Sequence, residues 1–210
     1  MRRTIQLLAG CGVALFAVNG CGSSSSPSTS SSGAGATTSG TGATAEAPNA
    51  LSAEAKSAAT GDIPDNQIFL TYTSSSPRYA MLYPEGWALK GSGANTTISE
   101  KNNIVRVVIA SGAAPTTAGV SAELSALKRS DPSLEFTAPN AIQLRSGPAV
   151  KATYTTRSAP NPVTGKSVLL MVDRYELNKG PLRATIDLGT PSGVDNVDAY
   201  RKMINSFIWQ

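Results

Sequence analysis

The segment that most constrains this fold is residues 22–60, which consist mostly of Ser, Thr, Gly, Ala and Pro. Such side chains bury too little apolar surface to offset the conformational entropy that is lost on folding. We therefore interpret residues 21–61 as a disordered tether and assign the fold to residues 62–210. A stretch of about 150 residues suits one domain with its own hydrophobic core.

The first twenty residues have the parts of an export signal. Arg2 and Arg3 precede an apolar run from Ile5 to Val18, which is too short for a lasting transmembrane helix. The sequence Val18-Asn19-Gly20-Cys21 that follows resembles the lipobox of bacterial lipoproteins, although Asn19 stands where a small residue is usual. Leu8-Ala9-Gly10-Cys11 matches the motif better locally but leaves too little apolar sequence before it. This pattern predicts a lipoprotein signal peptide over residues 1–20.

Lipidation of Cys21 would decide where the protein resides. The resemblance implies that palmitate or a similar acyl chain on Cys21 anchors the protein to the cell membrane or outer membrane, facing the extracytoplasmic side. Acyl chains gain about 0.8 kcal/mol per buried methylene, so this attachment would be effectively permanent. Ordinary cleavage and a retained, uncleaved anchor remain the alternatives. In each case residues 62–210 contain no cysteine.

Strand signals dominate the first half of the domain. Ile68–Tyr72 and Tyr79–Tyr83 are short β-rich runs, and Pro84-Glu85-Gly86 then predicts a turn that leads through Trp87 into another strand. Lys101-Asn102-Asn103 predicts a hairpin turn between Thr96–Ser99 and Ile104–Ile109. Helical spacing follows over Val120–Arg129, with Val120, Leu124 and Leu127 on one side.

The second half reads as long strands and a final helix. Val150–Arg157 and Leu182–Leu188 alternate between apolar and polar residues, which indicates strands with one buried face. Val168–Val172 is apolar throughout, which predicts a central strand that is covered on both sides. A helix is expected from about Asp195, with an apolar stripe formed by Val197, Tyr200, Ile204, Phe207 and Ile208.

These patterns predict an α+β fold with a mainly antiparallel sheet and helices on both faces, an α/β/α sandwich. The order of the elements, the Tyr83-Pro84-Glu85-Gly86-Trp87 turn and the closing Ser206-Phe207-Ile208-Trp209 resemble the PsbP-like superfamily, over Ile68–Gln210. The resemblance implies a binding or accessory role without catalysis, and it does not name the partner.

The composition argues against most catalytic and metal chemistry. The chain contains no histidine, which excludes a Ser-His-Asp triad and histidine metal ligands. Thr164-Gly165-Lys166-Ser167 matches only the end of a phosphate-binding loop and precedes a strand. The net charge of +4 is too mild to indicate nucleic-acid binding. We therefore expect a monomer that is not an enzyme and has no metal or cofactor.

Two sets of side chains are candidates for binding. The first set would form a polar, mixed-charge face on the hairpin strands, able to dock an envelope protein or an anionic glycan, although a solvated sheet face has the same pattern. The second set would line an apolar pocket for a lipid or another hydrophobic ligand, although aromatic side chains at element ends are also common core anchors. The first set is Lys151, Arg157, Arg174, Glu176, Arg183 and Asp187, and the second is Tyr83, Trp87, Phe207 and Trp209.

The predicted function is therefore that of a membrane-anchored lipoprotein with a non-catalytic binding domain. The alternative is a carrier of lipid or another hydrophobic ligand at the membrane surface.

Overall fold

A computed structural model describes residues 61–161 and 163–210. Cys21 and the whole predicted signal and tether up to residue 60 lie outside these described residues. Within them, no helix is both long and apolar enough to cross a membrane.

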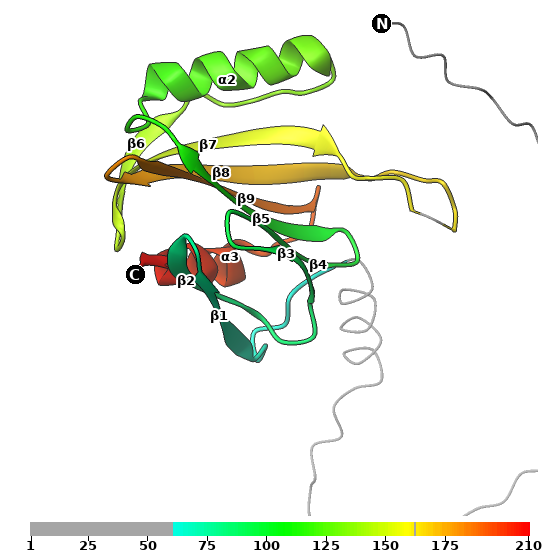
Figure 1. The fold of residues 1–210 in the computed structure, drawn as a ribbon. Coiled ribbons are helices and arrows are strands. Elements are labelled where there is room, and N and C mark those ends of the chain that lie inside the picture. The colour runs from blue at the N-terminus through cyan, green and yellow to red at the C-terminus, as the bar shows by residue number, and fades with distance from the viewer. Residues whose placement is uncertain (1–60, 162) are drawn as a thin grey trace, which may run out of the picture. The chain divides into compact units, whose positions relative to one another are not determined.

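The larger of two antiparallel sheets has seven strands in the order β3-β4-β5-β9-β8-β7-β6. Hairpins join β3 to β4, β4 to β5, β6 to β7, β7 to β8 and β8 to β9, so sequence neighbours are mostly spatial neighbours (Figure 1). Its strands are β3 (Ala88–Ser92), β4 (Asn95–Glu100), β5 (Asn103–Ser111), β6 (Asn140–Leu144), β7 (Gly147–Arg157), β8 (Leu169–Lys179) and β9 (Leu182–Pro191).

A smaller sheet has the order β1-β2-β10, built from β1 (Phe69–Ser75), β2 (Arg78–Pro84) and β10 (Ile208–Trp209). The predicted turn after β2 is present, and Gly86 there has a φ of 88°, a conformation that glycine adopts without steric cost. Ile208 and Trp209 pair with Ala80 and Tyr79 of β2, which brings the C-terminus back to the first hairpin.

The two helices within the described residues lie on opposite faces of the larger sheet (Figure 1). Helix α2 (Thr117–Ser130) packs over β7 and β8 through its two buried residues, Val120 and Leu124. Helix α3 (Val197–Ser206) packs through Tyr200, Met203 and Ile204 against the core that β5, β9 and the smaller sheet share. The predicted α+β class is confirmed, and the smaller sheet is an addition to the α3 layer that the sequence patterns did not indicate.

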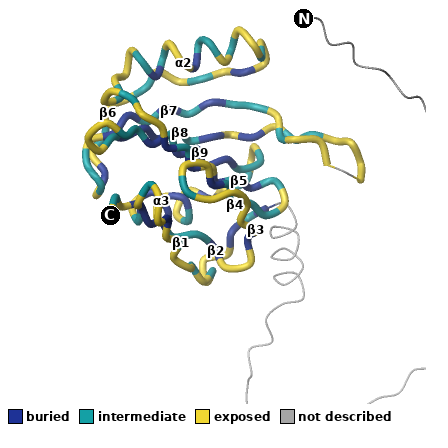
Figure 2. The backbone as a smooth tube through the Cα atoms, viewed as in Figure 1, coloured by how far each residue is buried: buried dark blue, intermediate teal, exposed yellow. Residues whose placement is uncertain are grey.

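The alternation of buried side chains explains the two core layers (Figure 2). On β9, Ala184, Ile186 and Leu188 are buried on the α3 side, as their spacing predicted. On β7, Val150, Ala152 and Tyr154 point to the α2 side and pack with Leu124. The sheet therefore separates two apolar clusters, one on each of its faces.

Three predictions about elements were wrong. Val168–Val172 is not covered on both sides, because Leu169 and Met171 are 45% and 46% exposed. The last helix ends at Ser206 and not beyond Phe207, because Ile208 pairs with β2 and because the Ser206 hydroxyl donates to the carbonyl of Met203. Val197, placed on the apolar stripe, is 58% exposed at the first position of α3.

Candidate binding surface

The six residues of the predicted polar face do not share one surface. Arg174 and Glu176 lie opposite Ala152 and Val150 in the register of β7 and β8, on the side that α2 covers. Lys151 and Arg157 alternate along β7 with the residues that face α2, so they project to the α3 side. Because successive strand residues point to opposite faces, the pairing register decides this grouping, and the sequence did not fix the register.

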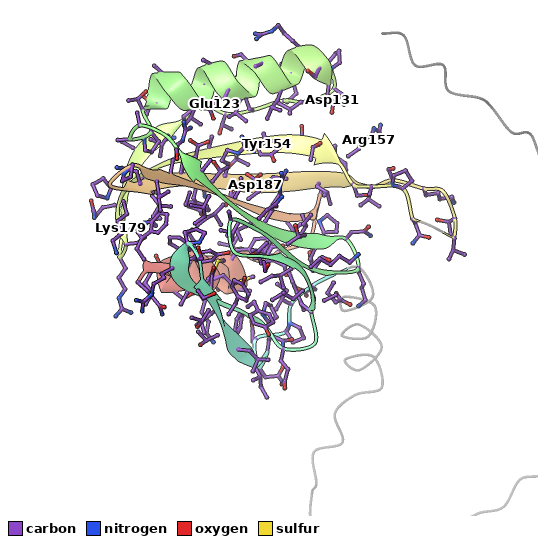
Figure 3. All side chains as sticks on the ribbon, viewed as in Figure 1. Glu123, Asp131, Tyr154, Arg157, Lys179 and Asp187 are labelled. Carbon is purple, nitrogen blue, oxygen red and sulfur yellow. The ribbon has the colours of Figure 1, made fainter. Side chains whose placement is uncertain are left out.

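Four of the six, Arg174, Asp187, Glu176 and Arg183, do come together on the α2 side. Arg174 and Asp187 form a two-pronged ion pair, with Nε 2.8 Å from Oδ1 and Nη2 2.9 Å from Oδ2. The two side chains are only 11% and 10% exposed (Figure 3 labels Asp187 beneath α2). Burial alone lowers the pKa of Arg174, but its hydrogen bonds and attraction to Asp187 raise it overall. Arg174 therefore stays charged, and the two parallel hydrogen bonds fix the pair in position.

Tyr154 borders this ion pair. The guanidinium carbon of Arg174 lies 5.2 Å from the centre of the Tyr154 ring. Burial, and next the negative charge of Asp187, raise the pKa of Tyr154 to about 12. The tyrosine therefore stays protonated. Its ring also stabilises the ion pair, because a cation above an aromatic face is attracted to it.

A second ion-pair cluster ties α2 to the sheet. Glu176 is fully buried and pairs with Nη2 of Arg183, which also lies 2.8 Å from Oε1 of Glu123 on α2. Oε1 of Glu176 and Nε of Arg183 have no hydrogen-bond partner among the described residues. These buried groups face the helix, so Glu176 and Arg183 are supports of the fold and are not open to a partner.

The exposed polar side chains lie farther along the same face. Lys90 of β3 is opposite Thr97 of β4, Thr97 is opposite Arg106 of β5, and Arg106 is opposite Asp187 of β9. We call Lys90, Thr97 and Arg106 the cationic row. Lys90 and Arg106 are exposed, and neither has an ion pair with another described residue.

The cationic row escaped the sequence prediction although a signal was present. Val105, Val107 and Ile109 alternate as the buried residues of β5, which leaves Arg106 pointing to the opposite face. The prediction concentrated instead on the long hairpin strands β7 to β9. The order of strands in the sheet, which places β5 beside β9, is what joins Arg106 to Asp187.

The four predicted pocket aromatics are divided between the core and separate hollows. Trp87 and Phe207 are buried, and the ring of Phe207 lies 5.6 Å from Tyr79 and 5.3 Å from Trp209, centre to centre. Tyr83 and Trp209 are partly buried and pack against the same core. The hollow of about 300 Å³ that Trp87 borders also has Asp62, Glu85, Glu100 and Lys101 in its wall, so it is charged and not an apolar pocket.

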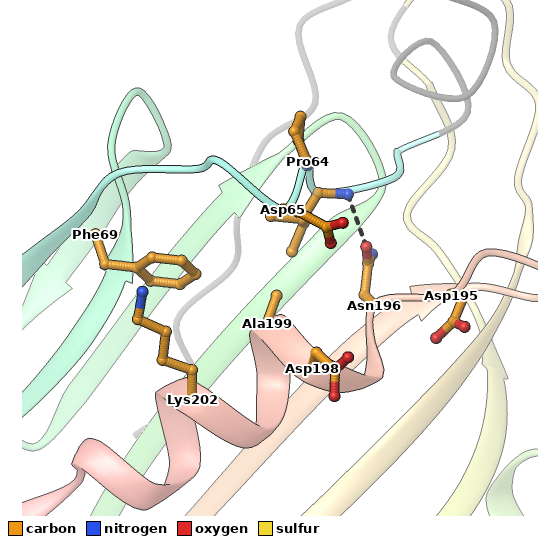
Figure 4. A pocket seen from close by; sticks show the side chains of 9 residues that line it. Pro64, Asp65, Phe69, Asp195, Asn196, Asp198, Ala199 and Lys202 are labelled. Carbon is orange, nitrogen blue, oxygen red and sulfur yellow. Dashed lines mark hydrogen bonds between the residues drawn. The ribbon is translucent and has the colours of Figure 1, made fainter. Parts of the chain in front are cut away.

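A smaller hollow, of about 200 Å³, lies at the start of α3 (Figure 4). Asp65, Asp195 and Asp198 stand at its wall, and the ammonium of Lys202 lies 4.1 Å from the centre of the Phe69 ring. The side-chain oxygen of Asn196 accepts a hydrogen bond of 2.8 Å from the backbone of Ile63. Within residues 61–161 and 163–210, no three acidic or other metal-binding side chains are grouped to hold an ion.

Comparisons with known proteins give structural similarity alone. No family model matches the sequence, and no curated protein matches it. Cyanobacterial PsbP (CyanoP) from Synechocystis sp. PCC 6803 is similar with a TM-score of 0.46 and 15% identity, over 70% of this chain and 96% of that one. The Ran-binding protein Mog1p of Saccharomyces cerevisiae has a TM-score of 0.46 and 7% identity, over 68% and 95%.

A protein of Bacteroides thetaiotaomicron VPI-5482 is similar with a TM-score of 0.42 and 13% identity, over 67% of this chain and 48% of that one. The PsbP structure bears the name of the superfamily that the sequence resembles. With TM-scores below 0.5, these similarities concern the general fold, and no functional statement rests on them.

Proposed function

We propose that this protein is a lipid-anchored, extracytoplasmic lipoprotein whose domain binds an acidic segment of an envelope protein without catalysing a reaction. The anchor is Cys21, and the sequence motif around it supports this assignment. The observation that carries the binding role is the cationic row. Lys90 and Arg106 are two exposed cations at fixed register positions on the sheet, and neither forms an ion pair with another residue that the structure describes.

The spacing of the row favours an extended acidic chain. Neighbouring strands lie about 4.8 Å apart, so Lys90 and Arg106, two strands apart, have backbones separated by roughly 10 Å. Carboxylates three residues apart on a peptide in the extended polyproline II conformation lie on one side of it and about 9 Å apart, because this helix has three residues per turn and rises about 3.1 Å per residue. The hydroxyl of Thr97 lies between the two cations and can donate to the same peptide.

The ion pair between Arg174 and Asp187 keeps Asp187 from neutralising Arg106 in the cationic row. Asp187 is the carboxylate opposite Arg106, but both of its oxygens accept hydrogen bonds from Arg174. Arg106 is therefore left to pair with a partner. The hydrophobic-carrier alternative is weaker, because the hollow beneath the Tyr83–Trp87 turn is bordered by charged side chains.

The test is to titrate the full-length protein with a fluorescent peptide that carries glutamate at every third position. Electrostatic contacts of this kind weaken with salt, so the measurement is made at low and at physiological ionic strength. Charge reversal in Lys90→Glu/Arg106→Glu is expected to lower affinity about tenfold or more, as two cation contacts are lost and replaced by repulsion. Arg145→Glu, an exposed cation on the turn between β6 and β7, is the matched control.

Equal affinity of the Lys90→Glu/Arg106→Glu and Arg145→Glu proteins would contradict the assigned surface. Binding of a sulfated or carboxylated oligosaccharide in preference to the peptide would move the proposal from a protein partner to a glycan.

A further inference from the structure

One end of the larger sheet carries exposed apolar side chains beside the point where the chain enters the domain. Leu169 and Met171 at the start of β8 are 45% and 46% exposed, and Val197 at the start of α3 is 58% exposed. Met171 lies opposite Thr190 of β9, whose hydroxyl accepts a hydrogen bond from Asn196, the residue before Val197. We call Leu169, Met171, Pro191, Val194 and Val197 the apolar end patch.

The patch is hollowed and lacks charge in its wall. A depression of about 460 Å³ is bordered by Leu169, Pro191 and Val194, together with Asn102, Val168, Ser192 and Gly193. None of these side chains is ionisable. An exposed apolar area of this kind commonly marks a contact with a protein or a membrane.

The chain enters the domain beside this patch. Gly61, the first described residue, lies close enough to Pro191 that a side-chain carbon on it would be 3.6 Å from Cγ of the proline. Its carbonyl accepts hydrogen bonds from the side chains of Asn103 and Asn196, which fix it there.

We propose that the apolar end patch rests on the lipid bilayer, where Leu169, Met171 and Val197 enter the interface between headgroups and acyl chains. This inference rests on the proposed function, in which Cys21 is held in that membrane. The 39 residues between Cys21 and Gly61 would span roughly 35 Å as a Gly/Ser-type coil, which gives the domain an effective concentration near the bilayer in the millimolar range. At that concentration, even a modest affinity of the patch for lipid is sufficient to keep it on the bilayer.

Charge does not select the lipid. Arg157 lies opposite Leu169 on the hairpin side, and Asp195 follows Val194 on the α3 side, so cations and anions both flank the patch. The contact is therefore apolar and holds on neutral headgroups. Leu169 and Met171 are also distinct from the cationic row, which lies on the opposite face of the sheet.

The test places a fluorophore near each end of strand β8 in the full chain, at Ser192 beside its start and at Lys179 at its end. Cys11→Ser and Cys21→Ser remove the native thiols, so the uncleaved apolar segment 5–18 attaches the chain to phosphatidylcholine vesicles and the result does not depend on lipidation. Ser192→Cys carries the dye beside the patch, and Lys179→Cys carries it at the far end of β8, about 33 Å away. Brominated acyl chains in the vesicles quench only fluorophores that reach the interface.

We expect strong quenching at Ser192→Cys and little at Lys179→Cys. Leu169→Ser/Met171→Ser should reduce the quenched population about tenfold, because the apolar area available for insertion is lost. Leu89→Ser/Ile208→Ser changes two side chains of similar exposure elsewhere and should leave the quenching unchanged. About 0.5 M NaCl should also leave it unchanged, since an apolar contact is not screened.

Equal quenching at both labels, or a chain that fails to associate with the vesicles, would overturn the inference. Quenching that disappears in 0.5 M NaCl would overturn it as well, because the contact would then be electrostatic. If Ser192→Cys is quenched but mass spectrometry of the wild-type protein finds no acyl chain on Cys21, the proposed anchor fails while the patch stands. Circular dichroism of each variant confirms that its fold is intact.

Discussion

Asp187 is a small side chain whose removal should strongly lower the free energy of unfolding. Its carboxylate neutralises Arg174, which is only 11% exposed and would otherwise be an uncompensated charge near the interior. We expect Asp187→Ala to lower the free energy of unfolding by about 3–5 kcal/mol, measured by urea denaturation. Glu135→Ala breaks an exposed pair with Lys128 and should cost about 1 kcal/mol or less. Equal losses would mean that Arg174 finds another partner or water.

The buried tyrosines should make the fold sensitive to alkali. Burial raises the pKa of Tyr79 from 10.0 to about 12, and Tyr154 reaches the same value. Because both folded pKa values exceed the unfolded value, their stabilisation is complete below pH 10 and is lost as the pH rises from about 10 to about 12. Each tyrosine should contribute a slope of about 1.4 kcal/mol per pH unit in that window.

Chemical denaturation of the wild type and of Tyr154→Phe at a series of pH values measures this slope. Above pH 10 the free energy of unfolding of the phenylalanine variant should fall less steeply with pH, because one ionisable group has been removed. Identical slopes would show that Tyr154 ionises in the folded protein as it does in the unfolded chain.

Helix α2 is the element that depends most on its cap. The hydroxyl of Thr116 accepts a 3.0 Å hydrogen bond from the backbone of Gly119, and only Val120 and Leu124 of the helix are buried. Thr116→Ala should cost about 1 kcal/mol and raise amide hydrogen exchange over residues 117–130. Thr117→Ala, one position later and also exposed, is the matched control. Faster exchange spread evenly over β7 to β9 would contradict a local role.

Elements with strong periodicity were predictable, and the pairing between them was not. The run Ile104–Ile109 identified its strand, and the alternation in Leu182–Leu188 identified both a strand and its buried face, which the structure confirms. Strand β6 has no such pattern and was not predicted, because its formation depends on pairing with β7. For the same reason the sequence grouped Lys151 with Arg174, whereas the register places them on opposite faces.

At the scale of the whole molecule, the elements within residues 61–161 and 163–210 leave two parts of the larger sheet uncovered. Helix α2 covers β7 and β8 on one face, and α3 with the smaller sheet covers β5 and β9 on the other. The cationic row occupies the open part of the first face, and Leu169 and Met171 occupy the open part of the second. The two proposals are therefore compatible, because a domain that rests on lipid through one surface keeps the other available for a partner.

The anchor is the property of the whole chain on which this arrangement depends. If Cys21 is acylated, the mature protein should begin at this residue and carry the mass of its acyl chains. Cys21→Ser should abolish both the acyl mass and removal of residues 1–20, whereas Cys11→Ser should change neither, because Cys11 would leave with the signal peptide. Intact-mass spectrometry of protein expressed in a bacterium that processes lipoproteins, with detergent phase partitioning, measures both effects. A wild-type chain that starts elsewhere and carries no acyl group would replace the lipid anchor with ordinary cleavage. The domain would then have to reach the bilayer through the apolar end patch alone, without the high local concentration that a tether supplies.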